Sequence, residues 1–98
     1  MKRLKNIHPG EVLLEDFLKP LGISQYRLAM ACALPHSRIT DIIKGRRAIS
    51  ADTALRLARA LGTSADLWLG LQRDFDVEEA SPANSKSYQA IPLLARVA

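Results

Sequence analysis

Apolar positions in the middle of the chain recur with a helical period, in two short blocks that flank a tight turn. Leu28 and Cys32 lie one helical turn apart in the first block, and Ile39 and Ile42 do so in the second. Pro35 lies between the blocks and suits the first turn of a helix, where its missing N–H is not needed. The pattern predicts one helix over residues 24–33 and a second over residues 35–44.

Further helices are predicted on both sides of this pair. A first helix opens at the sequence HPGE and is expected to stop at Pro20, because the residue before a proline avoids helical geometry. Ser50 and Ser64 are good caps for two later helices, and Gly62 ends the first of these. The expected core positions of these helices are Val12 or Leu13, Leu14, Phe17, Leu18, Ala54, Leu55, Leu57, Ala58, Leu61, Leu67, Trp68, Leu71 and Phe75.

The predicted fold class is therefore all-α, with five helices and a short extended C-terminal tail. We expect residues 1–79 to form the folded domain and residues 80–98 to form a flexible or strand-like tail. The stretch SPANSKS at 81–87 is typical of a linker. The apolar stretch after it is predicted to be extended, with Pro92 confining any strand to the edge of a sheet.

Length and composition limit the possible functions. With 98 residues the chain has room for one small domain, and no apolar run is long enough to span a bilayer, so a cytoplasmic protein is expected. A single cysteine excludes an internal disulfide, and because the other soft ligands are only two histidines, no structural zinc site is expected. No cofactor is expected.

Charge divides the chain into two unequal halves. The net charge is +4, yet residues 1–59 carry eleven Lys and Arg against five Asp and Glu, whereas residues 60–98 carry three against five. A basic first half suggests a polyanionic partner on one face. An ordinary solvated surface is the alternative, and charge alone does not decide between them.

The polar residues around the central helix pair favour a helix-turn-helix reader of DNA. In that arrangement the N-terminal part of the second helix enters the major groove, while the first helix spans the backbone. The alternative is a solvated helix face followed by a basic loop. The candidate base-reading residues are His36, Ser37, Arg38 and Thr40, and the candidate phosphate-binding residues are Gln25, Arg27, Lys44, Arg46 and Arg47.

Other residues give no indication of catalysis. Cys32 occupies an apolar position and is interpreted as a small core residue rather than a nucleophile. The glycines are scattered at helix ends, so no phosphate-binding glycine loop is present. The last predicted helix carries more apolar surface than one core face needs, which indicates a dimer interface that shares residues with the core, against the alternative of core alone. The candidate interface residues are Trp68, Leu69, Leu71 and Phe75.

Three phrases of the sequence resemble a known family. They are HPGEVLLEDFLKPLGISQYRLA, LPHSRITDIIKGRRAISADTALRLARALGTS and DLWLGLQ, which together run from about His8 to Gln72. They resemble the lambda-repressor-like (Xre-type) helix-turn-helix group and, within it, the HigA/VapI-type antitoxins. One departure is Ala33, where the wider group often has glycine. A non-glycine residue in a left-handed position costs about 1–2 kcal/mol.

The resemblance implies a homodimer that binds a palindromic double-stranded operator in its own promoter and represses transcription. It also implies neutralisation of a partner toxin, a RelE-like ribonuclease. The residues themselves supply a DNA-binding face and a possible dimer surface but no sign of the toxin. A solitary transcriptional regulator of phage or plasmid origin, without a toxin, is therefore the second hypothesis.

Overall fold

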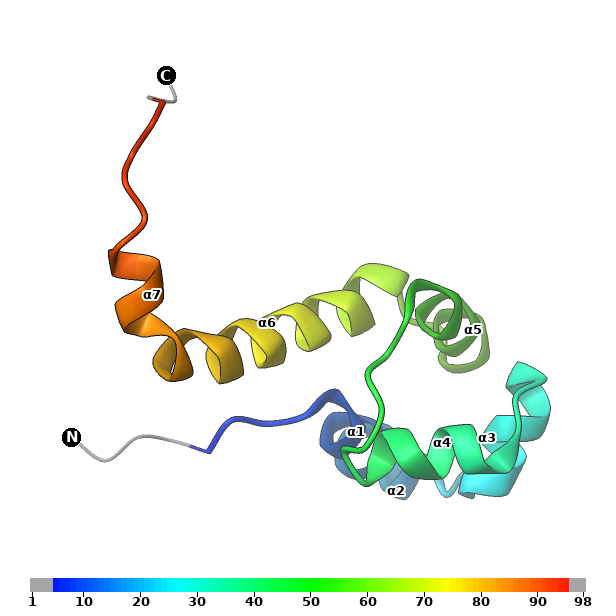
Figure 1. Cartoon of the computed structure of the whole chain (residues 1–98). Coiled ribbons are helices and arrows are strands. Elements are labelled where there is room, and N and C mark those ends of the chain that lie inside the picture. The colour runs from blue at the N-terminus through cyan, green and yellow to red at the C-terminus, as the bar shows by residue number, and fades with distance from the viewer. Residues whose placement is uncertain (1–4, 96–98) are drawn as a thin grey trace.

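The computed structural model describes residues 5–95, which form helices joined by short turns and contain no strand. The all-α prediction is therefore confirmed (Figure 1). In chain order, the elements are α1 (Pro9–Val12), the π-helical segment η1 (Leu13–Leu18), α2 (Lys19–Leu21), α3 (Gln25–Cys32), α4 (His36–Ile43), α5 (Ala51–Leu61), α6 (Ala65–Ala83) and α7 (Ser85–Gln89).

The first three elements form one continuous helical stretch, and the prediction that Pro20 ends it was wrong. Pro20 lies inside the last turn, and the stretch ends at Gly22, whose φ of 66° is left-handed. The N–H of Lys19 donates to the carbonyl of Leu14, five residues back, so the regular α-helical bonding is interrupted before the proline. A residue without an N–H is therefore tolerated at this position.

Three serines cap the later helices as predicted. The hydroxyl oxygen of Ser24 accepts the N–H of Arg27 at 3.0 Å, at the start of α3. Ser50 does the same at the start of α5, and Ser64 at the start of α6. Each serine satisfies one of the N–H groups that a helix start leaves without an internal partner.

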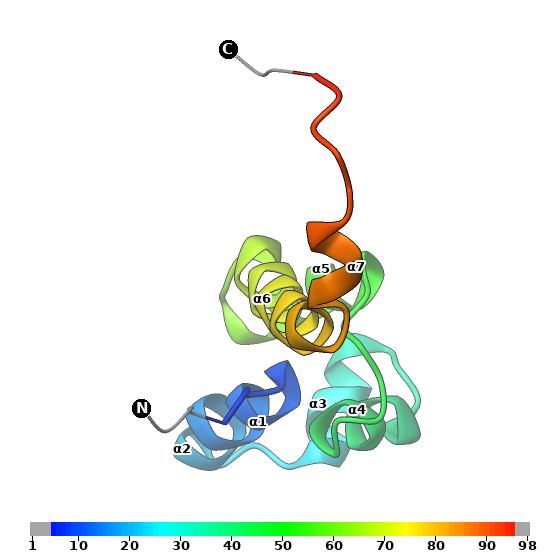
Figure 2. The ribbon, with the colours of Figure 1, turned by 60° about the vertical axis from the view of Figure 1, so that its left-hand side comes forward.

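The C-terminal region differs from the prediction, because the expected linker at 81–87 is largely helical. α6 continues through Pro82 to Ala83, and α7 follows after Asn84. The amide of Asn6 supports the distal part of α6 by donating to the carbonyl of Phe75 at 3.0 Å and to Glu79 at 3.1 Å. The extended tail begins only after Ile91, and Figures 1 and 2 show it leaving the body on the side away from α1–α4.

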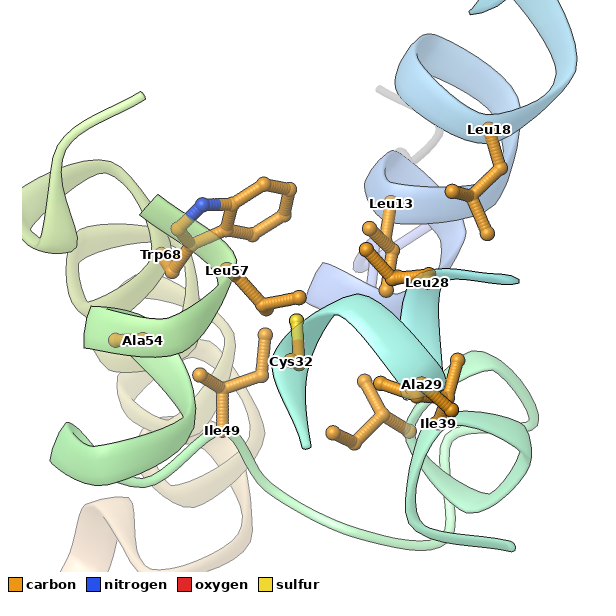
Figure 3. Close-up of a cluster of buried hydrophobic side chains, with 11 residues drawn as sticks. Leu13, Leu18, Leu28, Ala29, Cys32, Ile39, Ile49, Ala54, Leu57 and Trp68 are labelled. Carbon is orange, nitrogen blue, oxygen red and sulfur yellow. The ribbon is translucent and has the colours of Figure 1, made fainter. Parts of the chain in front are cut away.

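Two layers of helices enclose one core. Figure 2 shows α5 and α6 lying over the layer formed by α1–α4. Leu55, which was predicted to face the core, is 60% exposed on α5, so that prediction was wrong. Figure 3 shows the apolar side chains that meet between the layers. The buried set is Leu13, Leu18, Leu28, Ala29, Cys32, Ile39, Ile42, Ile49, Ala54, Leu57 and Trp68.

Trp68 lies at the centre of this core and not in a surface suited to a second subunit. Its side chain has 0% exposure, and its ring packs against Phe17 with centroids 5.1 Å apart. The indole N–H donates to the hydroxyl of Thr63 at 2.8 Å, so the polar edge of the buried ring is satisfied. Trp68 therefore belongs to the core alone, and its predicted assignment to the dimer interface is corrected.

The backbone of the first helix lies directly against the backbone at the end of α4. Gly10 is buried, and a Cβ added there would lie 1.8 Å from the carbonyl oxygen of Ile42 and 2.8 Å from the Cα of Ile43. Both neighbours are backbone atoms, which cannot move aside as a flexible side chain can. Only glycine permits this approach, which fixes the position of the C-terminal end of α4.

Gly10→Ala is expected to destabilise the fold by at least about 3 kcal/mol, the upper end of the usual cost of overpacking, because no rotamer change relieves the contact. Chemical denaturation of the full chain measures the effect. The matched control is Gly70→Ala in α6, where the nearest atom is the Arg73 guanidinium at 3.8 Å. That change should stabilise by about 0.5–1 kcal/mol. Equal stabilities of the two variants would contradict the proposed close contact.

Candidate nucleic-acid interface

α3 and α4 form a helix–turn–helix unit with a tight, left-handed turn. Ala33 has φ 55° and ψ 44°, so this chain keeps the left-handed turn without glycine. The N–H groups of Ala33 and Leu34 donate to the carbonyls of Met30 and Ala29 at 3.1 and 3.0 Å, which closes the end of α3. The capped helix end offsets the strain of an alanine in this conformation.

The predicted base-reading residues do not all share one face of α4. Because successive helical residues rotate by about 100°, Ser37 and Thr40 lie roughly opposite the buried Ile39 and Ile42, and His36 lies at the edge of the same face, about 40° from Thr40. His36 and Ser37 are exposed, and Thr40 is half-buried. Arg38 is also half-buried and lies at the flank of this outward face. The structure therefore brings three of the four together and places Arg38 beside them.

Two contacts join the outward face of α4 to the start of α3. The hydroxyl of Thr40 donates to the side-chain oxygen of Gln25 at 3.1 Å. The rings of Tyr26 and His36 meet edge to face, with centroids 5.9 Å apart and an interplanar angle of 88°. Among residues 5–95, no hydrogen bond occupies the amide N–H groups of Gln25, as a phosphate-binding residue requires. The sequence predicts Tyr26 on the outer side of its helix, where it could also touch the DNA backbone, but it does not predict the contact with His36.

The basic loop, which we define as residues 44–48, directly follows α4. Lys44, Arg46 and Arg47 are exposed there, and none of them forms an ion pair within the described part of the chain. The N–H of Arg46 donates to the carbonyl of Asp41 at 2.8 Å, so the loop folds back on the end of α4. Arg27 is likewise exposed on α3. The predicted phosphate-binding cations thus lie next to the outward face of α4.

A buried glutamine anchors the far end of the basic loop, and sequence reasoning missed it. Gln72 on α6 is 6% exposed, and its side-chain oxygen accepts the N–H of Ile49 at 2.8 Å. Its amide N–H donates to Asp76 at 2.9 Å. Ile49 itself is buried in the core. The only signal in the sequence was a polar residue four positions after Trp68, on the apolar side of the helix.

His8 caps α1 and lies beneath the basic loop. Its Nδ1 accepts the N–H of Gly10 at 2.9 Å, and its ring meets Phe75 edge to face at 4.8 Å. His8 and Gly45 line the same 170 Å³ hollow. Burial lowers the pKa of His8, and the Asp76 carboxylate opposes this in part. The neutral imidazole is the form that can accept the Gly10 hydrogen bond.

The remaining chemistry in the described range is structural. Burial raises the pKa of the Cys32 thiol, although Arg56 lowers it in part, so the buried thiol is a poor nucleophile. Within residues 5–95, no three His, Cys, Asp or Glu side chains gather in a way that could hold a metal ion. None of the helices there is both long and apolar enough to cross a membrane.

Comparison with known proteins gives consistent matches. The Helix-turn-helix family matches residues 14–68. The chain is 45% identical to Virulence-associated protein I of Dichelobacter nodosus over 87 residues, which cover 89% of this chain and 81% of that protein. Among solved structures, it is similar to Pseudomonas aeruginosa antitoxin HigA with higBA promoter, with a TM-score of 0.85, 39% identity, and coverage of 93% of this chain and 100% of that one.

A second solved structure is similarly close. Antitoxin GraA in complex with its operator superposes with a TM-score of 0.86 at 34% identity, and 98% of each chain is covered. Over these ranges, the similarity includes α3, α4 and the helices that support them.

Lowering the pH from about 7 to about 5 is expected to destabilise the protein through His8. Its unfolded pKa is about 6.5 and its folded pKa is lower, so the unfolded state takes up the proton first. The contribution of His8 to stability is therefore complete above about pH 6.5 and is lost as the pH falls toward the folded pKa. Urea midpoints measured across this range report the loss.

His8→Asn tests the assignment, because an asparagine oxygen can cap the helix but does not titrate here. The variant should lose less stability between pH 7 and 5 than the parent chain. His36→Gln, which alters the other histidine and no helix cap, is the matched control. A His8→Asn protein with the full pH dependence would remove His8 from this explanation.

Proposed function

The chain belongs to the helix-turn-helix family that includes HigA and Virulence-associated protein I, and we propose that it is the operator-binding antitoxin of a toxin–antitoxin pair. It would act as a dimer that represses its own promoter and would neutralise a partner toxin. The observation that carries the proposal is the outward face of α4, which lies beside an exposed basic loop that has no acidic partner among residues 5–95.

Charge pairing supports the DNA-binding part of the proposal. Several cations elsewhere on the surface form ion pairs, such as Lys19 with Glu15 at 2.7 Å and Arg56 with Asp52 at 2.8 Å, although Arg59 and Lys86 form none among the described residues. The cations of the basic loop form none among the described residues. Cations that are left unpaired beside a helix reader are available to phosphates, and they release counterions from DNA when they bind.

In this proposal the two groups of residues have different tasks. Side chains on and beside the outward face of α4 contact base edges in the major groove and select the sequence. Side chains on α3 and in the basic loop bind phosphates and fix the register. The base-reading set is His36, Ser37, Arg38 and Thr40, and the phosphate-binding set is Gln25, Arg27, Lys44, Arg46 and Arg47.

The proposed dimer uses the C-terminal third of the chain. Leu69 and Leu71 are partly buried against the core, and Phe75 packs on His8, so these three present only their edges to a partner. Larger apolar surfaces are exposed beyond them, on Val77 at 60% and in the tail after α7. The proposed interface therefore keeps Leu69, Leu71 and Phe75 and adds Val77, Tyr88, Ile91, Leu93 and Leu94.

The proposal of a toxin partner is supported by the family alone. HigA and GraA are named as antitoxins in the structures that this chain resembles. We propose a RelE-like ribonuclease as the partner, encoded beside this gene. Co-expression with the product of the neighbouring reading frame tests this. A stable complex and relief of growth arrest support the antitoxin, whereas no complex would leave a solitary transcriptional regulator.

DNA binding is expected to weaken steeply with salt. Three or four phosphate-binding cations per subunit give a dimer a log–log slope of about −5 to −7 against salt concentration. Replacing both Arg46 and Arg47 by glutamine should reduce the slope by about 3–4 and weaken binding to all sequences alike. Fluorescence anisotropy with a duplex from the upstream region measures this.

Arg73→Gln is the matched control for the salt experiment, because Arg73 is exposed on α6 and already pairs with Asp74. It should leave the slope unchanged. A slope near zero for the parent chain would show that the basic loop does not bind the DNA backbone.

Val77→Asp is expected to convert the dimer into a monomer, because it places a charge in the proposed apolar interface. Sedimentation equilibrium should then give the 10.8 kDa mass of one chain, and operator affinity should fall. The matched control is Leu55→Asp, which alters an equally exposed apolar residue on α5, outside the proposed interface. If both variants remain dimeric, the interface lies elsewhere.

A further inference from the structure

The α3–α4 unit contains two side-by-side contacts between a residue of the first helix and a residue on the outward face of the second. Gln25 accepts a hydrogen bond from Thr40 at 3.1 Å, and the next residue, Tyr26, meets the ring of His36 at 5.9 Å. His36 and Thr40 are four residues apart, so they lie one turn apart on the same face. Two consecutive residues of α3 therefore contact two successive turns of α4.

Within the described residues, the side chain of His36 forms no hydrogen bond or ion pair, and its one ring contact is with Tyr26. It is exposed at the first position of α4, and Pro35, the residue that precedes it, makes no side-chain cap. The ring of Tyr26 is its only contact of this kind there. An edge-to-face pair at this separation is a favourable arrangement for two aromatic rings. The imidazole is thus oriented by α3 and not by its own helix.

We propose that Tyr26 is a specificity-determining positioning residue, which orients the imidazole of His36 toward the base edge that it reads. The inference rests on the proposed function, in which α4 enters the major groove. An imidazole nitrogen donates or accepts a hydrogen bond according to its orientation and protonation, so a fixed ring presents a defined pattern to the base pair. A freely rotating ring can satisfy more than one base pair. Tyr26 therefore sharpens selection at one position of each half-site without contacting the base.

The test begins with selection of duplexes from a random-sequence library by the full-length parent chain. Affinities are then measured for the best recovered duplex and for duplexes changed at each base pair of a half-site. Removing His36 by His36→Ala identifies the base pair that it reads. Tyr26→Leu should reduce discrimination at that base pair by about 2- to 10-fold and leave the other positions unchanged. Tyr26→Phe, which keeps the ring, should retain the parent preference.

A double variant separates positioning from a direct contact. In the His36→Ala background, Tyr26→Leu should cause no further loss of discrimination, because the ring that it orients is gone. The matched control is Met30→Ala, which alters an exposed residue one turn further along the same side of α3. Its base preferences and thermal midpoint should equal those of the parent chain.

Other results would overturn the inference. An equal loss of affinity on every duplex for Tyr26→Leu would indicate a structural or backbone role, and the thermal midpoint would tell these apart. A uniform loss for Tyr26→Phe would indicate a hydroxyl contact to phosphate. An unchanged preference after His36→Ala would mean that there is no reading ring to position. If the parent chain selects no sequence at all, the proposed function itself fails, which is a distinguishable outcome.

Discussion

The contact between Gly10 and the carbonyl of Ile42 is the constraint on which the placement of α4 depends. At this point the backbone of α1 lies against the backbone of α4, with no side chain between them. A larger separation would shift the end of α4 and the basic loop that follows it. The cations therefore lie beside the outward face of α4 because Gly10, on another helix, has no side chain. His8, two residues earlier, extends the same contact by capping α1 beneath the loop.

Buried polar groups fix α6 against the segments that pack on it with a directionality that apolar packing lacks. Gln72 and Trp68 each use a side-chain hydrogen bond to hold a segment outside α6, at Ile49 and Thr63 respectively. An unsatisfied buried group would cost about 1–3 kcal/mol, so other arrangements of the layers are disfavoured. Within residues 5–95, no buried side-chain nitrogen or oxygen lacks a partner. These hydrogen bonds thus fix the position of α6, which carries part of the proposed dimer surface, relative to the basic loop.

Local rules in the sequence predicted local features well. The caps at Ser24, Ser50 and Ser64 were correct because each involves only the next three residues. The end of the first helix was misplaced at Pro20, because proline was judged without the π-helical bonding that precedes it. The stretch 81–87 was misread because linker composition does not reveal the support that Asn6 gives to α6 across the fold.

The residues of the candidate site could be proposed from the sequence, but their contacts with one another and with the neighbouring helices could not. The cations and the polar face of α4 follow from helical spacing, whereas the half-buried flank position of Arg38 depends on the neighbouring helices. Trp68 was assigned to an interface because periodicity cannot tell which part of a broad apolar stripe the core will cover. Gly10 and Gln72 gave almost no signal, since their roles consist of contacts with residues more than twenty positions away in sequence.

The length of α6 has a consequence for the spacing of the proposed half-sites. One residue of this helix, Gln72, is bonded to the segment that follows the basic loop, and Val77 on the same helix belongs to the proposed subunit contact. An insertion of a single residue between them would rotate the partner subunit by about 100° and move it by about 1.5 Å along the helix axis. Insertions of three or four residues would leave a rotation of only about 40–60° together with a translation of about one turn. The length of α6 between Gln72 and Val77 thus sets the rotation of one subunit relative to the other, and this rotation must match the helical repeat of the DNA. Relatives with an altered α6 length should therefore differ in the distance between their operator half-sites.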